Sequence, residues 1–302
     1  MASYQKKTRS KDPSFKRRRS EAPDTQRVIP IVSVTPSSTL KLGQADRLLS
    51  GLNHRLYRQH GAYRLKLDLL SSSSHSSVKV FALANTWYIK RSIQTAKQIH
   101  DFATEEERAM GVQSRWYDFR IDHNTQGGHD DLVTDLRNAP GAAQTPSVHP
   151  GEYSPSVIQD AAGTMKEFRV LGATSGSGWN IFDEYDNLGN TARDPDQALP
   201  SGGAYDGADA TIAGGNIEAM ANRGDLPPYN NTNFAGEMFV EVANLYRHSG
   251  GGSFTGNQRL STGFFDAPLG LFWVQYGSPD EAVRLQLEVK AGNYKGVHME
   301  AY

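Results

Sequence analysis

The first twenty residues carry side chains whose type and spacing indicate one chemistry, the binding of phosphate. Eight of them are Lys or Arg and one is acidic, a charge of +7, whereas the remaining chain has 24 basic and 32 acidic residues, a charge of −8. Each cation that neutralises a backbone phosphate releases a condensed counterion, so such a segment binds nucleic acid without reading its sequence. The predicted binding residues in this segment are Lys6, Lys7, Arg9, Lys11, Lys16, Arg17, Arg18 and Arg19.

The basic segment has little to bury. Between Lys6 and Arg19 the only aromatic residue is Phe15, and the like charges repel one another. We therefore expect residues 1–27 to form a disordered arm outside a folded domain of residues 28–302. A solubilising tail or a signal for nuclear import would have the same composition. Lys6-Lys7 and the run from Lys16 to Arg19 have the spacing of a bipartite import signal, which makes an import receptor a predicted partner.

The basic bias continues beyond the arm. Residues 1–100 contain 19 basic and 5 acidic residues; beyond the arm, two of the basic ones lie shortly before the first clear strand and two lie in it. Arg64 and Lys66 share one side of this alternating segment with Asp68, so we expect them on its solvent-facing side. The predicted extension of the nucleic-acid-binding surface consists of Arg55, Arg58, Arg64 and Lys66.

Several classes of protein are excluded by composition. The chain contains no cysteine, which rules out disulfides and zinc-thiolate sites. No run of 18 apolar residues occurs, so we expect no membrane insertion. The chain also lacks the Gly-x-Ser-x-Gly and His-Glu-x-x-His motifs of hydrolases, and we predict that it is not an enzyme and has no catalytic residue.

Two groups of residues have the types that bind metal ions. The first group lies in a Gly-rich stretch without helical or strand spacing, so we favour a solvated loop; it comprises His123, His129, Asp130 and Asp131. The second group offers the hard oxygen ligands that calcium prefers, but without an EF-hand pattern; it comprises Asp183, Glu184, Asp186, Asp194, Asp196, Asp206 and Asp209. We predict no cofactor and a solvated acidic face, with calcium between subunits as the alternative.

Alternation of apolar and polar residues predicts strands along the folded domain. The clearest alternation runs over residues 283–290. Further strands are predicted at 63–70, 78–83 continuing into 86–93, 115–122, 168–172, 237–246 and 269–276. Residues 28–35 alternate around Pro30, which cannot donate to a ladder, so we expect an edge strand or a tether there and not a core strand.

Two segments indicate short helices. Within residues 40–60 one helical face would carry Leu48, Leu49, Leu52 and Leu56. In 102–110, Thr104 and Glu107 have the spacing of a capping box, and Gly111 follows as a terminator.

Long irregular stretches separate these elements. Residues 122–165 and 173–234 are rich in Gly, Pro, Asn and Asp, so we expect two loop insertions, the second with a short helix at 216–223. About eight strands with unequal loops fit a jelly roll, whose loops all leave at the ends of the sandwich. The predicted fold is all-β: an eight-stranded antiparallel jelly-roll sandwich with long loops, one or two short helices and a disordered basic arm.

The basic arm, the cysteine-free strand pattern and the C-terminal segments 266–275 and 285–297 resemble single-jelly-roll capsid proteins of small circular Rep-encoding single-stranded DNA viruses. The resemblance covers the whole chain by pattern and includes no invariant motif. It implies a homo-oligomeric icosahedral shell, with the sandwich as its wall and the arms on the genome. It also implies residence in the virion and, during assembly, in the host nucleus.

Alternative functions remain open at this point. The arm is shorter and less Arg-dense than is usual in circovirus capsid proteins, which keeps a coat protein of a small positive-strand RNA virus, assembling in the cytoplasm, as an alternative. A different class is a monomeric jelly-roll carbohydrate-binding module or hydrolase with a basic nuclear-targeting tail. A particle of many copies would distinguish the first class from the second.

Overall fold

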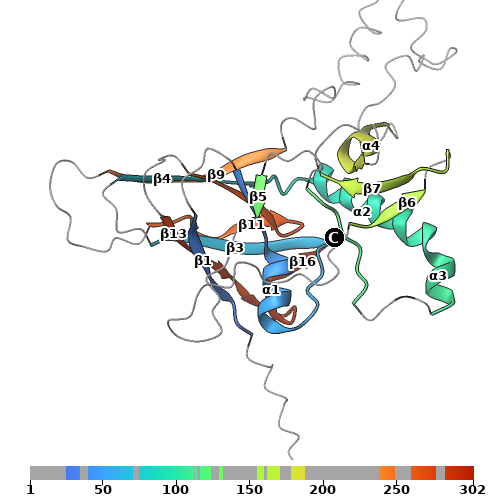
Figure 1. Cartoon of the computed structure of the whole chain (residues 1–302), viewed down its shortest axis with the longest axis horizontal. Helices are drawn as coiled ribbons and strands as arrows, with labels where there is room; N and C mark the ends of the chain where they lie inside the picture. The colour runs from blue at the N-terminus through green and yellow to red at the C-terminus, as the bar shows by residue number, and fades with distance from the viewer. Residues whose placement is uncertain are drawn as a thin grey trace, which may run out of the picture.

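The computed structural model describes residues 25–34, 40–70, 75–111, 113, 116–123, 129–131, 155–159, 162–170, 178–187, 238–248, 260–276 and 283–302. The predicted binding residues from Lys6 to Arg19 and the predicted helix at 216–223 lie outside these ranges. Within them the chain forms sixteen strands and four helices, and most of the strand pairs are antiparallel (Figure 1). The prediction of a mostly β protein is therefore confirmed.

One large sheet contains six strands. Its main path is β1 (Val28–Val34), β13 (Val283–Val289), β3 (Gly61–Leu69) and β10 (Leu260–Ser261). Two further strands pair with β3: β11 (Phe265–Pro268) and β16 (Met299–Ala301). Every pair in this sheet is antiparallel. The strand predicted at 283–290 is confirmed as β13, and it lies in the interior of the sheet because it has a strand on each side.

The second large sheet has five strands. Its order is β5 (His129–Asp131), β2 (Leu40–Gln44), β12 (Leu271–Tyr276), β4 (His75–Leu83) and β9 (Phe239–His248). Here β2 and β5 run parallel, and the other pairs are antiparallel.

Two small sheets complete the strands that the structure describes. They are β14 (Ala291–Gly292) with β15 (Gly296–Val297), and β6 (Val157–Gln159) with β7 (Met165–Arg169) and β8 (Gly178–Asn180). Strands β7 and β8 run parallel. The described residues form more strands than the eight predicted, and two strand pairs are parallel where antiparallel pairing was predicted. The extra strands have two to five residues, which is too few for alternation to reveal.

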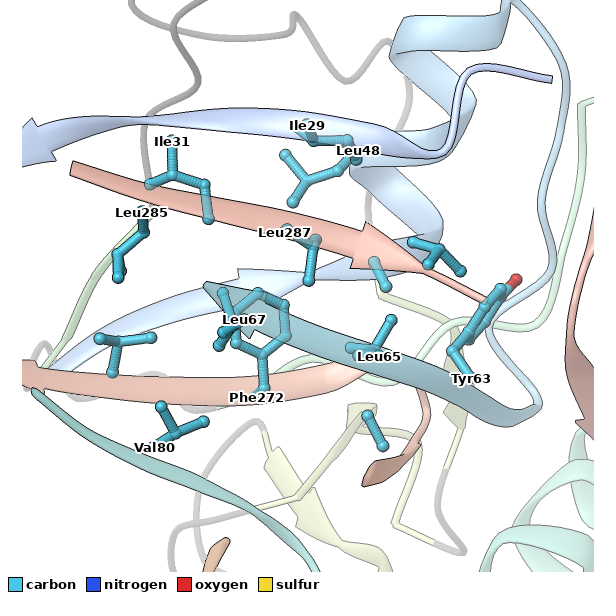
Figure 2. Close-up of a cluster of buried hydrophobic side chains, with 14 of the residues drawn as sticks. Ile29, Ile31, Leu48, Tyr63, Leu65, Leu67, Val80, Phe272, Leu285 and Leu287 are labelled. Atoms are coloured by element: carbon cyan, nitrogen blue, oxygen red, sulfur yellow. The ribbon is translucent and has the colours of Figure 1, made fainter. Parts of the chain in front are cut away.

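The two large sheets enclose a hydrophobic core between them (Figure 2). Alternation along β3 points Leu65 and Leu67 into this core, and β13 contributes Leu285 and Leu287 in the same way. These four side chains and Phe272 of β12 are each at most 1% exposed. Fully burying one such side chain stabilises the fold by roughly 1.5–3 kcal/mol.

The described residues between β4 and β9, which we call the insertion (within 84–238), supply β5 to the second sheet, and the others cover the outer face of that sheet. They form α2 (Trp87–Ala103), α3 (Glu105–Ala109), α4 (Ile181–Asn187) and the sheet of β6, β7 and β8. Leu42 and Trp273 of the second sheet pack with Ile93, Phe168 and Phe182 of the insertion in a second core. Because the sheet is buried on both faces here, β12 is apolar without interruption from residue 271 to 274.

The segment 86–93, predicted as a strand, instead begins helix α2. Thr86 caps the helix, since the backbone N–H of Ile89 donates to its Oγ1 at 3.4 Å. The buried positions Ile89, Ile93, Ala96 and His100 recur every three or four residues, as expected for one helical face. Within the described residues, no helix is both long enough and apolar enough to cross a membrane.

The other two predicted helical segments are confirmed only in part. Residues 40–60 contain helix α1 (Ala45–Asn53), with Leu48 and Leu49 buried, but Leu40–Gln44 is strand β2. The segment 102–110 comprises the end of α2 and all of α3. The predicted capping box is wrong, because the Thr104 hydroxyl donates to the carbonyl of His100 at 2.8 Å and does not cap α3. Gly111 has a φ of 69° and ends this stretch as predicted.

Several remaining predictions need correction. Strand β1 lies at a sheet edge as expected, yet Ile29 and Ile31 are buried in the main core, so it is more than a tether. The described residues of 115–122 form no strand, only one bridge from Asp122 to Arg169, and the strand predicted at 168–172 is β7, which ends at Arg169. The predicted loop regions 122–165 and 173–234 contain β5, β6, β8 and α4.

Gly43 of β2 marks a close contact inside the main core. It pairs with Phe272 of β12, and a Cβ at Gly43 would lie 2.1 Å from Cζ of that ring. We expect Gly43→Ala to force the ring from its site and destabilise the protein by about 1–3 kcal/mol. Thermal unfolding of Gly43→Ala, Phe272→Leu and the double variant checks this. The double variant should lose less stability than the sum of the two, and additive losses would contradict the contact.

Candidate nucleic-acid interface

The part of the chain that the structure describes begins at Thr25, next to the basic arm. The Thr25 hydroxyl donates to the carbonyl of Lys295 at 3.0 Å. The backbone N–H of Gln26 donates to the Asn53 side chain of α1 at 2.8 Å, and the Asn53 amide donates back to the Gln26 carbonyl at 3.0 Å. Residues 25–27 are thus held between the end of α1 and the turn at 293–295, and we call this place the arm root (Figure 1).

Arg55 and Arg58 lie at the arm root. Helix α1 ends at Asn53, and the next residue, His54, has a φ of 50° that turns the chain into residues 55–60. Tyr57 in this segment is 1% exposed, and its hydroxyl donates to the Lys295 carbonyl at 3.0 Å. With Tyr57 fixed inside, Arg55 is half-buried and Arg58 is exposed. The structure therefore keeps these two predicted residues beside the arm.

Lys295 is a third cation at the arm root, and sequence reasoning missed it. Its ammonium lies 5.9 Å from the ring centre of Tyr57 and 5.3 Å from that of Tyr294, and it donates to the Leu56 carbonyl. Burial lowers the pKa of Lys295, and the positive charges of Arg58 and Arg55 lower it further. The sequence around it, Tyr294-Lys295-Gly296, indicates only a turn. It does not predict contacts with Leu56 and Tyr57, which lie more than 200 residues earlier in the chain.

Arg64 and Lys66 lie elsewhere, on the outer face of β3. Arg64 Nε is 3.9 Å from a carboxylate oxygen of Asp266 on β11. Lys66 pairs with Glu288 of β13 and lies 3.7 Å from Asp68, whose side chain is 1% exposed. The predicted shared face is correct, but Asp68 is buried, and both cations lie within 4 Å of a carboxylate on a neighbouring strand. That they bind phosphate stays a prediction, and these carboxylates would compete with a phosphate for both cations.

A buried acidic group lies behind the arm root. The side chain of Asp118 is 6% exposed, its Oδ2 accepts a hydrogen bond from the Gln59 backbone N–H at 3.2 Å, and its Oδ1 is 3.8 Å from His60 Nδ1. Burial raises the pKa of the Asp118 carboxyl, and Arg58 opposes that rise. Asp46, at the start of α1, is 2% exposed, and burial raises its pKa to about 7.

Asp46 and His60 should make stability depend on pH in opposite directions. Between pH 3.8 and about 7 the unfolded chain ionises Asp46 while the folded chain keeps it protonated, so its contribution falls as pH rises. Burial lowers the pKa of His60 from 6.5 to about 4. Between those values the unfolded chain protonates His60 and the folded chain does not, so its contribution falls as pH falls.

In Asp46→Asn the effect of His60 remains, so we expect this variant to lose stability as the pH falls from 7 towards 4. In His60→Gln the effect of Asp46 remains, so we expect this variant to lose stability as the pH rises from 4 towards 7. The raised pKa of Asp118 acts in the same direction as that of Asp46. Urea denaturation at several pH values between 4 and 7 measures the two profiles. If both variants and the parent chain show parallel profiles, neither group is linked to folding.

The two groups of residues with metal-binding types, for which we favoured a solvated loop and a solvated acidic face, are not brought together in the part of the chain that the structure describes. His123 is 6% exposed and accepts a hydrogen bond at Nε2 from Trp273 Nε1 at 3.3 Å, so it is a packed residue and not part of a solvated loop. His129, Asp130 and Asp131 form β5. Asp183, Glu184 and Asp186 lie in α4, and the other predicted acids fall outside the described residues. Among the described residues, no three His, Asp or Glu side chains are arranged to hold a metal ion.

No protein-family model, curated protein or solved structure matches this chain. Its function is therefore inferred from its own residues and their arrangement.

Proposed function

We propose that this protein is a viral capsid subunit whose sandwich is a jelly roll. Eight strand positions pair in a nested way: the first with the last, the second with the seventh, the third with the sixth and the fourth with the fifth. These pairs are β1 with β13, β2 with β12, β3 with β10 and β11, and β4 with β9, all antiparallel. A long hairpin that wraps into two sheets has this pairing, which is how a jelly roll is built. The nested pairing is the observation that carries the proposal.

Two further pairs support the wrapping. Strand β13 also pairs with β3, and β12 also pairs with β4. The first of these joins the pair β1–β13 to the pair of β3 with β10 and β11 in one sheet. The second joins the pair β2–β12 to the pair β4–β9 in the other sheet. The strands of the two sheets then share the core of Figure 2.

The fold alone does not select a function, because jelly rolls also occur in lectins and cupins. The charge distribution favours the capsid. An arm of charge +7 joins the sandwich beside Arg55, Arg58 and Lys295, whereas the remaining chain carries −8. In the proposed assembly the sandwiches form the wall and the arms bind the genome. In a carbohydrate-binding module the same arm would serve only as a nuclear-targeting tail.

Electron microscopy of the purified full-length chain tests the proposal. We expect closed particles of many copies, with or without added single-stranded DNA. A chain that remains monomeric under both conditions would contradict the capsid function. Glycan binding or glycan hydrolysis by that monomer would then identify the alternative class.

The genome is proposed to be single-stranded DNA, and assembly is proposed to take place in the nucleus. The bipartite basic spacing of the arm supports nuclear import. Nucleic acid extracted from particles and treated separately with DNase and RNase identifies the genome. A product that only RNase digests would favour the RNA-virus alternative, with assembly in the cytoplasm.

Binding of nucleic acid by the full-length chain should weaken steeply with salt and vary little with base sequence, because phosphate contacts supply it. A protein with six to ten phosphate contacts loses roughly 10³- to 10⁵-fold in affinity between 50 and 200 mM salt. Fluorescence anisotropy with two single strands of different composition measures both properties. A flat salt response would indicate recognition of bases instead.

A further inference from the structure

We propose that Arg55, Arg58 and Lys295 form a phosphate-binding site for the nucleic-acid backbone at the root of the arm. This site rests on the proposed function and adds to it a fixed contact on the folded domain. It also separates these three cations from Arg64 and Lys66, which do not belong to the site.

Position is the first argument. Thr25 is hydrogen-bonded to Lys295, and Gln26 to Asn53 at the end of α1. The last residues before β1 are therefore in contact with the segment that carries the third cation. A strand of nucleic acid that the arm binds is delivered to the place where Arg55, Arg58 and Lys295 lie.

The charge balance at the site is the second argument. No carboxylate among the described residues lies within 4 Å of the charged nitrogens of Arg55, Arg58 or Lys295, whereas Arg64 and Lys66 both have such partners. The acid that acts on Lys295 is Asp118, whose side chain is only 6% exposed and is engaged by the Gln59 backbone. Arg58 and Lys295 are exposed and Arg55 is half-buried, and both arginines act on the charge of Lys295. Neighbouring cations without a paired acid gain most from an anion.

Preorganisation is the third argument. The Arg58 backbone N–H donates to the Tyr294 hydroxyl at 3.0 Å, and the rings of Tyr57 and Tyr294 pack edge to face at 6.1 Å. Lys295 lies over both rings and donates to the Leu56 carbonyl. Because these contacts already order the segments that carry the cations, less conformational entropy is lost when a phosphate binds.

The site should recognise phosphates and not bases. The Lys295 ammonium lies over the Tyr294 ring at 5.3 Å, so this ring is not free to stack on a base. Binding is then expected to be independent of the base sequence. Each cation that neutralises a phosphate should release counterions condensed on the nucleic acid.

The test compares two full-length variants of matched chemistry, both with the arm intact. On single-stranded DNA each phosphate contact contributes about 0.7 to the slope of log affinity against log salt concentration. We expect Arg55→Gln/Arg58→Gln/Lys295→Gln to reduce that slope by about 2. Arg64→Gln/Lys66→Gln should reduce it by less than about 0.5, because these cations are already paired. Oligo-dT and a mixed-sequence strand serve as probes.

Two further measurements keep the result interpretable. Lys295→Arg retains the charge and should retain the slope, and thermal unfolding shows whether each variant is folded. An unchanged slope in the folded triple variant, or an equal reduction in both multiple variants, overturns the site. Particles seen by electron microscopy with an unchanged slope would reject this site but not the capsid function. Absence of both particles and DNA binding in the parent chain would reject the capsid function itself.

Discussion

Replacing Leu287 with Asp is expected to abolish folding and assembly. Leu287 is 0% exposed in the main core, and its strand β13 has β1 on one side and β3 on the other. Asp at this position would bury a carboxylate among apolar side chains such as Leu67 and Ile29, which pair with it across the sheet. The expected cost is several kcal/mol, comparable with the whole ~5–15 kcal/mol stability of a typical domain.

Glu288→Gln is the matched control on the same strand. Glu288 points away from the core and pairs with Lys66, both side chains being partly exposed. Loss of this pair should cost about 1 kcal/mol or less, since Lys66 retains Asp68 at 3.7 Å. Soluble yield, thermal unfolding and electron microscopy compare the two variants. Equal yields of assembled particles would show that β13 is not an interior strand of the sandwich.

Deleting residues 1–20 is expected to leave a folded protein that has lost most of its nucleic-acid binding. The segment contains eight of the chain's cations, and the described contacts of the sandwich begin only at Thr25. The salt slope on single-stranded DNA should fall by about 5 to 6. The remaining slope, about 2, is what Arg55, Arg58 and Lys295 would supply. Affinity of the truncated chain should then change by only roughly tenfold to twentyfold between 50 and 200 mM salt.

Two control chains separate charge from length. An arm with its eight Lys and Arg residues replaced by Gln should behave like the deletion. An arm of the same composition in shuffled order should bind like the parent chain, because counterion release does not depend on order. Undiminished binding by the truncated chain at physiological salt would show that the arm is not the principal binding element.

Long alternating strands were the most predictable part of the fold. Residues 63–69 and 283–289 alternate because β3 and β13 each have one face in the main core. Helix α2 was mistaken for a strand because its first residues, Trp87, Tyr88 and Ile89, have high strand propensity. Its helical period appears only when the segment is followed to His100, where the buried face continues.

The interface could be predicted only where neighbours in sequence are neighbours in space. The sequence indicated that Arg64 and Lys66 share a face, but not that Asp266 and Glu288 from other strands pair with them. Likewise, Lys295 joins Arg55 and Arg58 only because the C-terminal turn folds back against α1 and Tyr57. Such contacts depend on strand order and register, which alternation along one strand does not contain.

The two ends of the insertion meet at one point of the second sheet. Leu83 pairs directly with Phe239, and the backbone N–H of Ala84 donates to the Met238 carbonyl at 2.8 Å. Outside β5, which pairs with β2, the length of the insertion can therefore change over evolutionary time without shifting the pairing of β4 with β9. Each doubling of a loop costs only about 0.6 kcal/mol in closure entropy. The side chains of the insertion that pack on Leu42 and Trp273 must stay apolar, among them Ile93, Phe168 and Phe182. Related chains are expected to diverge fastest between residues 84 and 238, while the nested strands and these apolar side chains change slowly.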